Sequence, residues 1–305
     1  MTLREISYII TVVEKQSITG AAAGLFISQP ALSQAIARVE RELGCRLFVR
    51  RGNATVPTEA GLLVAKRGRM LLLAHDRLVT EVRSLGGEQR HMLRFGISPF
   101  YSKYYLPRVY QHYVANNPAV HLEVVEKTSF ELERMVASGE LPFCFVPEAP
   151  GIPELHYEAL GEEELLLAVP PSHPVNALAE RVEGVPSIRL DYVQGEPFIL
   201  LPKTQKVASL QDRIIASAHL TPRTVYQTAN WDTAYALTSC GMGMSILPSV
   251  LRHERGGEHG AVFYRMQGVE AFRTYAAAYL TGEVLTPEAL QLIDVMRTVV
   301  QGKNR

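Results

Sequence analysis

The sequence has few of the residues from which disulfide frameworks and membrane spans are built. Its three cysteines, Cys45, Cys144 and Cys240, lie far apart and form no Cys-x-x-Cys pair. We therefore expect buried free thiols, since a redox-sensing pair requires two of them to meet in space. No apolar run approaches the ~18 residues of a transmembrane helix, and the amphipathic N-terminus does not resemble a signal peptide. A cytoplasmic protein without a membrane partner is expected.

Motifs that mark common enzyme active sites are also missing. The chain has no Gly-x-Ser-x-Gly, no His-Glu-x-x-His and no P-loop, and its nine histidines lack the spacing of metal ligands. The acidic run Glu162-Glu163-Glu164 is typical of a solvated surface, and the Gly-x-Gly at residues 241–243 is too short for a nucleotide fingerprint. We expect no enzymatic activity, no metal and no cofactor.

The net charge of the chain is zero, but the charged residues are unevenly distributed along it. Residues 1–90 contain thirteen Lys and Arg against eight Asp and Glu, a net charge of +5, and the remainder carries −5. A basic first part fits a DNA-binding head on a body that need not touch DNA. Hydrophobic residues make up 47% of the 305 residues, which is enough for two or three domains with their own cores.

Residues 17–43 show two short helical patterns separated by a turn. Ser17 can cap a small-residue helix, and Ser28 followed by Pro30 predicts the start of the next one. An apolar stripe predicts the buried face of this second helix: Leu32, Ile36, Val39 and Leu43. An earlier helix is predicted from Leu3, Ile6, Ile10 and Val13. Three such helices make a helix-turn-helix unit, although an ordinary helical hairpin in a larger core is the alternative.

A basic, turn-rich stretch follows these helices. In RLFVRRGNATVPTEAG, residues 46–61, the Gly52-Asn53 turn suits a β-hairpin. Arg46, Arg50 and Arg51 flank that turn. A hairpin wing of this kind can lay its cations along DNA phosphates.

Together these segments resemble the DNA-binding domain of the LysR-type transcriptional regulators. The family pattern has a Ser-Phe-Thr-like cap, an Ala-Ala pair, SQPALS, an LE-x-x-LG-x-x-LF-x-R run and T-x-AG. Its counterparts here are Ser17-Ile18-Thr19, Ala21-Ala22, Ser28 to Ser33, Val39 to Arg50, and Thr58 to Gly61. The match spans roughly the first sixty residues. Gly20 and Gln34 stand where family members often carry Arg, and Gln favours adenine whereas Arg favours guanine.

The resemblance implies an α/β protein with an N-terminal all-α winged helix-turn-helix and a C-terminal, two-lobed effector domain of periplasmic-binding-protein type. The implied domains are a DNA-binding domain at 1–57, a linker (dimerisation) helix at 58–87 and an effector-binding domain at 88–305. Lobe I takes about 88–162 and 268–305, and lobe II about 163–267. The implied partners are double-stranded DNA, a small-molecule effector and further copies of the chain, in a homodimer or homotetramer. RNA polymerase is a further candidate.

The DNA contacts combine the resemblance with the residues that the helical pattern turns outward. The expected set is Ser28, Gln29, Pro30, Ser33, Gln34, Arg38, Arg50 and Arg51. The residues of the second helix would read base edges, and the two wing arginines would hold the backbone or minor groove.

A long helix is predicted from about Thr58 to Leu85, and at 1.5 Å per residue it would extend about 40 Å. Alternating steps of four and three give a coiled-coil seam of Val64, Gly68, Leu71, His75, Leu78, Val82 and Leu85. The alternative is a helix packed on its own domain. Gly86-Gly87 ends the helix and marks a hinge.

Beyond residue 92 short strands alternate with helical stretches, which predicts parallel α/β units. The predicted strands are Leu93 to Ile97, His121 to Glu126, Phe143 to Val146, Leu165 to Val169, Phe198 to Leu201, Thr224 to Gln227 and Met244 to Leu247. Thr286-Pro287 predicts the start of a final amphipathic helix.

Ligands of open α/β sheets bind beyond the carboxyl ends of strands, where helix N-termini offer unpaired amides. In the family these loops face the space between the lobes, which implies an anionic or polar, carboxylate-bearing effector here. The expected contacts are Ser98, Phe100, Tyr101, Ser102, Thr128, Lys203, Thr204 and Trp231, with Lys103 and Phe145 as further candidates. For each hydroxyl the alternative is a plain N-cap, and for each aromatic ring a place in the core.

Two other functions are compatible with parts of the sequence. A cytosolic small-molecule-binding protein, or an enzyme with a helical module that does not bind DNA, would account for the α/β lobes. The binding protein would leave residues 1–61 without a role, and the enzyme lacks a visible active-site motif. Deleting those residues separates the alternatives, because only a regulator would lose affinity for DNA while keeping its ligand.

Overall fold

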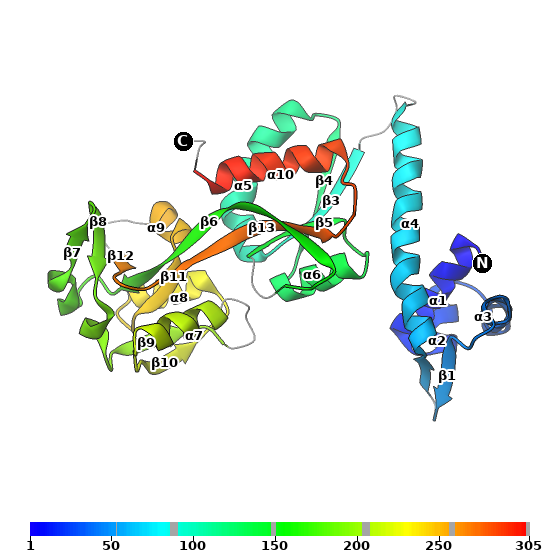
Figure 1. Cartoon of the computed structure of the whole chain (residues 1–305), viewed down its shortest axis with the longest axis horizontal. Coiled ribbons are helices and arrows are strands. Elements are labelled where there is room, and N and C mark those ends of the chain that lie inside the picture. Colours follow the sequence, from blue (N-terminus) through cyan, green and yellow to red (C-terminus); the bar gives the residue numbers. More distant parts are fainter. Residues whose placement is uncertain (53, 86–90, 148–150, 203–207, 256–259, 303–305) are drawn as a thin grey trace. The chain divides into compact units, whose positions relative to one another are not determined.

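The computed structural model of the chain (Figure 1) describes residues 1–305 except 53, 86–90, 148–150, 203–207, 256–259 and 303–305. The chain forms two compact units. The first holds Met1–Arg94 with the stretches Ala119–Glu123 and Arg134–Pro142, and the second holds Phe95–Pro118, Val124–Glu133 and Phe143–Arg305. The predicted helix-turn-helix lies in the first unit.

Three short helices begin the chain: α1 (Leu3–Lys15), α2 (Ile18–Gly24) and α3 (Gln29–Leu43). Ser17 and Ser28 are the predicted N-caps, because their hydroxyls accept hydrogen bonds from the backbone amides of Gly20 and Ala31. A buried cluster joins the three helices: Val12, Ala21, Ala22, Leu32 and Ile36. The predicted stripe is wrong at its last position, since Leu43 is exposed on the final turn of α3.

The basic stretch forms the predicted hairpin, with β1 (Phe48–Arg51) antiparallel to β2 (Ala54–Pro57). Phe48 pairs with Pro57 and Arg51 pairs with Ala54. Gly52 has φ +60°, a left-handed conformation that suits the tight turn. The other residue of the predicted turn, Asn53, lies outside the described residues.

The predicted long helix is confirmed as α4 (Glu59–Leu85). The residues of its predicted coiled-coil seam, however, lie in two different environments. Val64 packs on the core of the N-terminal helices, and a Cβ on Gly68 would press on the side chain of Ile6. The first part of the seam therefore packs within its own unit. Further along, Leu71, Leu78 and Val82 are exposed, as a face for a second copy requires.

Gly61 lies where α4 meets the wing, and we expect Gly61→Ala to destabilise the N-terminal unit by more than about 1–3 kcal/mol. A Cβ at this position would lie well inside 3.0 Å of the backbone carbonyl oxygen of Leu47. That oxygen accepts the hydrogen bond from the Thr58 amide that begins the helix, so backbone must move. Urea unfolding measures the effect.

Gly24→Ala is the matched control, because no heavy atom lies within 4 Å of its added Cβ. It is expected to leave stability unchanged or to raise it slightly, since alanine favours helices. Equal stability of the two variants would contradict the close approach of Gly61 to Leu47.

A mixed nine-stranded sheet has most of its residues in the second unit. Its strands run in the order β4-β3-β5-β13-β6-β12-β8-β7, and β11 also pairs with β6. The first part of β6 pairs antiparallel with β13, and its last five residues, Leu165–Val169, pair antiparallel with β11 and β12. The expectation of parallel units holds for β3 with β5 and for β9 with β10, but it missed the long antiparallel pair of β6 and β13.

The seven predicted strands are all present, but four further strands were not predicted and break the expected alternation with helices. The strands are β3 (His91–Ile97), β4 (Val120–Glu126), β5 (Phe143–Pro147), β6 (Leu155–Val169), β7 (Glu180–Val182), β8 (Val185–Ile188), β9 (Pro197–Leu200), β10 (Arg223–Gln227), β11 (Ser245–Pro248), β12 (Val262–Met266) and β13 (Phe272–Leu280). The helices are α5 (Pro99–Asn116), α6 (Ser129–Ala137), α7 (Ala208–Ser217), α8 (Trp231–Ser239), α9 (Val250–Arg255) and α10 (Pro287–Val300), with 3-10 turns at Pro174–Leu178 and Leu190–Val193. In the part of the chain that the structure describes, no helix is both long and apolar enough to cross a membrane.

The structure corrects two expectations from the sequence, one about Phe145 and one about the cysteines. Phe145 stacks edge-on with Phe95 and Phe143 and is fully buried, so it is a core residue and not part of a ligand surface. Of the three cysteines only Cys144 is buried, whereas Cys45 and Cys240 are exposed. Cys45 follows Gly44, the C-cap of α3, and Cys240 is itself the C-cap of α8.

Candidate functional site

The first turns of α3 present a row of polar side chains to solvent. Ser28, Gln29, Pro30 and Gln34 are exposed, and Ser33 is half-buried. The two glutamine amides carry both donors and acceptors, and the helix N-terminus adds a partial positive charge. This surface can hydrogen-bond to base edges and phosphate oxygens.

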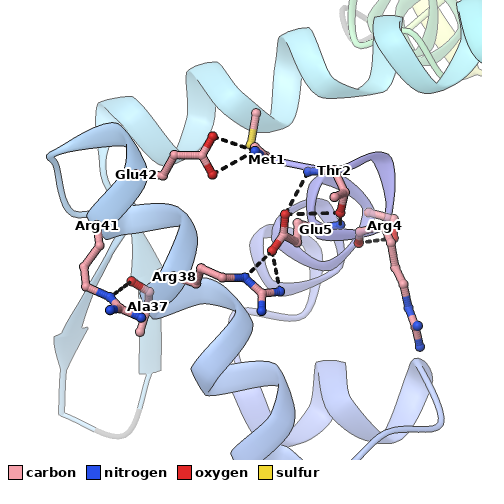
Figure 2. Close-up of polar contacts among 9 residues, drawn as sticks. Met1, Thr2, Arg4, Glu5, Ala37, Arg38, Arg41 and Glu42 are labelled. Carbon is pink, nitrogen blue, oxygen red and sulfur yellow. Dashed lines mark hydrogen bonds and ion pairs between the residues drawn. The ribbon is translucent and has the colours of Figure 1, made fainter.

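Arg38 is also exposed, but its guanidinium is already engaged. Figure 2 shows it reaching from α3 to Glu5 on α1, with 2.7 Å between Nε and Oε1 of the carboxylate. Glu5 is buried and completes a capping box with Thr2. The hydrogen bond from the Thr2 amide, assisted by Arg38, holds the pKa of Glu5 below its usual value. Arg38 thus fixes the angle of α3 against α1 while part of its side chain still faces solvent.

On the wing, Arg50 and Arg51 are exposed as predicted. Arg46 differs, because its guanidinium donates to Glu40 Oε2 at 2.8 Å. Glu40 is buried on α3, and its other oxygen accepts hydrogen bonds from the backbone amides of Leu47 and Phe48. Sequence reasoning missed this glutamate, which ties α3 to the wing; its position four residues after Ile36, on the side of the apolar stripe, was the available signal.

In the second unit the N-termini of α5 and α8 come together. The ring centroids of Phe100 and Trp231 are 6.1 Å apart. Beside them, Lys103 Nζ lies 3.0 Å from Asp232 Oδ2, and the Tyr104 hydroxyl donates to the same carboxylate. The structure therefore brings together three predicted effector residues, Phe100, Lys103 and Trp231, and adds Tyr104 and Asp232, which the sequence did not single out.

Ser98 and Thr128 differ in what their hydroxyls do. Ser98 occupies the N-cap position of α5, is half-buried, and makes no side-chain capping hydrogen bond. Thr128 is exposed, and its hydroxyl exchanges hydrogen bonds with Glu131 and the Glu131 amide in a capping box. The Ser98 hydroxyl is available to a ligand, whereas a ligand at Thr128 would have to share it with α6.

Four other predicted contacts are either buried or outside the described residues. Ser102 is buried on the second turn of α5. Lys203 and Thr204 lie outside the described residues. Tyr101 is fully enclosed, and its hydroxyl donates to Glu163 Oε2 at 2.5 Å.

Tyr101 joins a buried charge network at the paired strands β6 and β13. Glu163 and Arg273 are direct register partners, and Arg273 Nε lies 2.6 Å from Glu163 Oε2. Burial raises the pKa of the Tyr101 phenol well above its ordinary value, which keeps it a neutral donor. Glu163 Oε1, Arg273 Nη1 and the Tyr275 hydroxyl are buried and have no hydrogen-bond partner among the residues that the structure describes. The solvated surface predicted for residues 162–164 is therefore wrong at Glu163, which is 3% exposed.

None of the described side chains forms a group of three or more His, Cys, Asp or Glu that could hold a metal ion. The two candidate surfaces instead offer hydrogen-bonding groups and charged side chains. The α3 and wing surface suits a polyanion, and the α5 and α8 N-termini suit a small polar ligand.

Comparison with known proteins agrees with this division. Residues 3–62 match the family model for bacterial regulatory helix-turn-helix proteins of the lysR family, and residues 86–301 match the LysR substrate binding domain. The chain is 27% identical to the uncharacterized HTH-type transcriptional regulator YcgK of Bacillus subtilis, over 97% of this chain and 94% of that protein. It is 29% identical to the transcriptional activator protein LysR of Escherichia coli, over 81% and 77% of the two chains.

Solved structures share the fold along the whole chain. A full-length OxyR from Pseudomonas aeruginosa superposes with a TM-score of 0.70 at 22% identity, covering 98% of this chain and 95% of that one. Full-length CbnR in complex with its target DNA gives a TM-score of 0.63 at 20% identity, covering 98% and 100%. With both family models matched in order, the chain belongs to the LysR family of bacterial transcriptional regulators.

Proposed function

We propose that this protein is a cytoplasmic, sequence-specific DNA-binding regulator, without enzymatic activity, controlled by a small anionic effector bound between two α/β lobes. The observation that carries the proposal is the polar surface of α3 beside two exposed wing arginines, in a chain whose second unit matches a ligand-binding domain. Both parts are needed, because a ligand-binding domain alone would leave the exposed glutamines of α3 without a function.

The DNA surface divides into base-reading and backbone-holding parts. Gln29, Pro30, Ser33 and Gln34 of α3 would face base edges in the major groove, and Arg50 and Arg51 would face phosphates or the minor groove. Two copies joined through the exposed face of α4 would present two such surfaces to the half-sites of a near-palindrome. CbnR has been solved with its target DNA, and the shared fold makes the same docking reasonable here.

Gln34→Ala is expected to relax sequence preference at one base pair by about 1–3 kcal/mol, because a glutamine amide can bond a base edge in two places. The residue is exposed, so the fold should be unaffected. Selection of duplexes from a random-sequence pool, followed by competition binding, measures the change. Equal losses on selected and random DNA would refute the base-reading role of Gln34.

Charged groups at the N-terminus of α8 indicate where an effector would bind. Asp232 lies in the first turn of α8, where a helix N-terminus favours an anion, and it already pairs with Lys103 and Tyr104. A carboxylate-bearing effector would compete with Asp232 for these groups and would find the Ser98 hydroxyl unoccupied. The resulting shift of α5 against α8 would change the arrangement of the lobes and, through the oligomer, the spacing of the DNA-binding units.

Ser98→Ala is expected to weaken binding of a stabilising carboxylate by about tenfold, the value of one hydrogen bond to a charged group. A panel of small carboxylates is screened first by thermal shift on the wild type, and titration calorimetry then compares variants. Because Ser98 makes no capping bond, its replacement should leave the unligated melting temperature unchanged.

Thr128 is tested with a matched pair. Thr128→Val should weaken the same ligand and also lower stability, since it removes the cap of α6, whereas Thr128→Ser should keep both. Unchanged affinity in Thr128→Val would remove this residue from the site. Binding of a carboxylate that leaves DNA footprints identical would contradict the proposed switch.

A further inference from the structure

Phe26 stands apart from the other large apolar residues because 95% of its surface is exposed, the highest value among those described. Its neighbours Leu25 and Ile27 both pack against the buried cluster of the three N-terminal helices. The flanking residues thus point inward and leave the Phe26 ring directed into solvent. A ring that contacts so little of its own chain adds almost nothing to the core.

The backbone of Phe26 is also unusual. Its φ is +56°, in the left-handed region that bulky side chains avoid. The conformation is fixed by hydrogen bonds from the amides of Phe26 and Ile27 to the carbonyls of Ala23 and Ala22. Glycine would relieve this strain, yet the nearby glycine, Gly24, lies in α2 and has an ordinary backbone. The turn therefore keeps a strained and exposed aromatic residue, a combination that marks functional positions.

The position of Phe26 identifies what it can meet. Phe26 lies two residues before Ser28, the N-cap of α3. Ser28, Gln29 and Pro30, which begin this helix, are exposed as well. A protein partner would bury an apolar patch, but the next exposed residues along the chain, Ser28, Gln29 and Pro30, are polar or proline. Duplex DNA offers both kinds of contact at once, because a major groove presents hydrogen-bonding edges beside the apolar 5-methyl group of thymine.

We propose that Phe26 is a specificity-determining residue whose ring packs on the 5-methyl group of a thymine at the edge of the half-site read by α3. The inference rests on the proposed function of α3 and adds an apolar contact to its polar ones. It also accounts for the left-handed turn, which holds the ring outward at the N-terminal end of the recognition helix.

The test uses full-length Phe26→Asn and duplexes that the wild type selects from a random-sequence pool. Asparagine tolerates the left-handed backbone, so the melting temperature should stay the same or rise, whereas affinity should fall about tenfold from the lost apolar area. Replacing thymine by uracil, one position at a time, should weaken the wild type about fourfold at one position of each half-site, the value of one buried methyl group. Phe26→Asn should be insensitive to uracil at that position.

Glu183→Asn is the matched control, because Glu183 has φ +50° in the turn between β7 and β8 of the second unit. It should relieve similar strain without changing DNA binding. Unchanged affinity in Phe26→Asn, a loss equal on selected and random duplexes, or a fall in melting temperature would each overturn the assignment. Failure of the proposed function looks different, because the wild type itself would then select no sequence.

Discussion

Arg273→Met is expected to lower the free energy of unfolding of the second unit by about 3–5 kcal/mol. The side chains of Arg273 and Glu163 are only 5% and 3% exposed. Removing the guanidinium leaves the carboxylate buried without a countercharge and takes a donor from the Tyr101 hydroxyl. Urea unfolding, followed by a signal from the single tryptophan, Trp231, in the same unit, measures the loss.

The double variant Glu163→Met/Arg273→Met is the control that separates charge from packing. Replacing both members of a buried ion pair by apolar residues of similar size is often neutral or stabilising. It should therefore recover most of the stability lost by Arg273→Met, although the Tyr101 hydroxyl loses its acceptor. If the double variant were as unstable as the single one, the ion pair would contribute to stability through side-chain packing and not through charge.

The same double variant bears on regulation. Tyr101 lies on the first turns of α5, beside Ser98 and Phe100, and its hydroxyl reaches the paired strands β6 and β13. The network already leaves three buried polar atoms unpartnered, which is costly in the state observed. A ligand that moves α5 acts directly on these atoms, so the double variant should bind a carboxylate but transmit the signal to DNA less effectively.

The N-terminal unit was predictable because its signals are local. Ser17 and Ser28 lie within three residues of the amides they cap, and the α3 stripe repeats within a single helix. The prediction failed at Leu43, where the helix ends, and along the first part of the α4 seam. Val64 and Gly68 follow a heptad spacing, but that spacing cannot tell whether the partner is α1 of the same chain or α4 of a second copy.

The second unit was less predictable because its decisive contacts join distant residues. Glu163 sits in an acidic triplet that is typical of a surface, and Arg273, 110 residues later, gives no local sign of pairing with it. Their meeting depends on the register of β6 against β13, a strand that the sequence did not predict. Likewise, Lys103 and Asp232 come together only through the fold, so the sequence could propose Ser98 and Trp231 without showing what neutralises the charges beside them.

The double variant Arg50→Ala/Arg51→Ala is expected to show the largest loss of DNA affinity. Each arginine that neutralises a phosphate releases counterions, so its loss costs about fivefold at ~0.15 M salt and lowers the salt slope by about 0.9. Two arginines in each of two DNA-binding units thus amount to a loss of several hundredfold. Both side chains are exposed on β1 and support no core, so stability should not change.

Salt titrations by fluorescence anisotropy, on selected and on random duplexes, distinguish this electrostatic role from base reading. The loss should be nearly the same on both duplexes and should shrink as salt rises, because phosphates carry no sequence information. Arg189→Ala is the control for a lost surface charge: it removes one exposed arginine, paired with Asp191 in the second unit, and its salt slope should match the wild type. A loss confined to selected duplexes would instead place Arg50 or Arg51 at base edges, and an unchanged slope would remove the wing from the DNA surface.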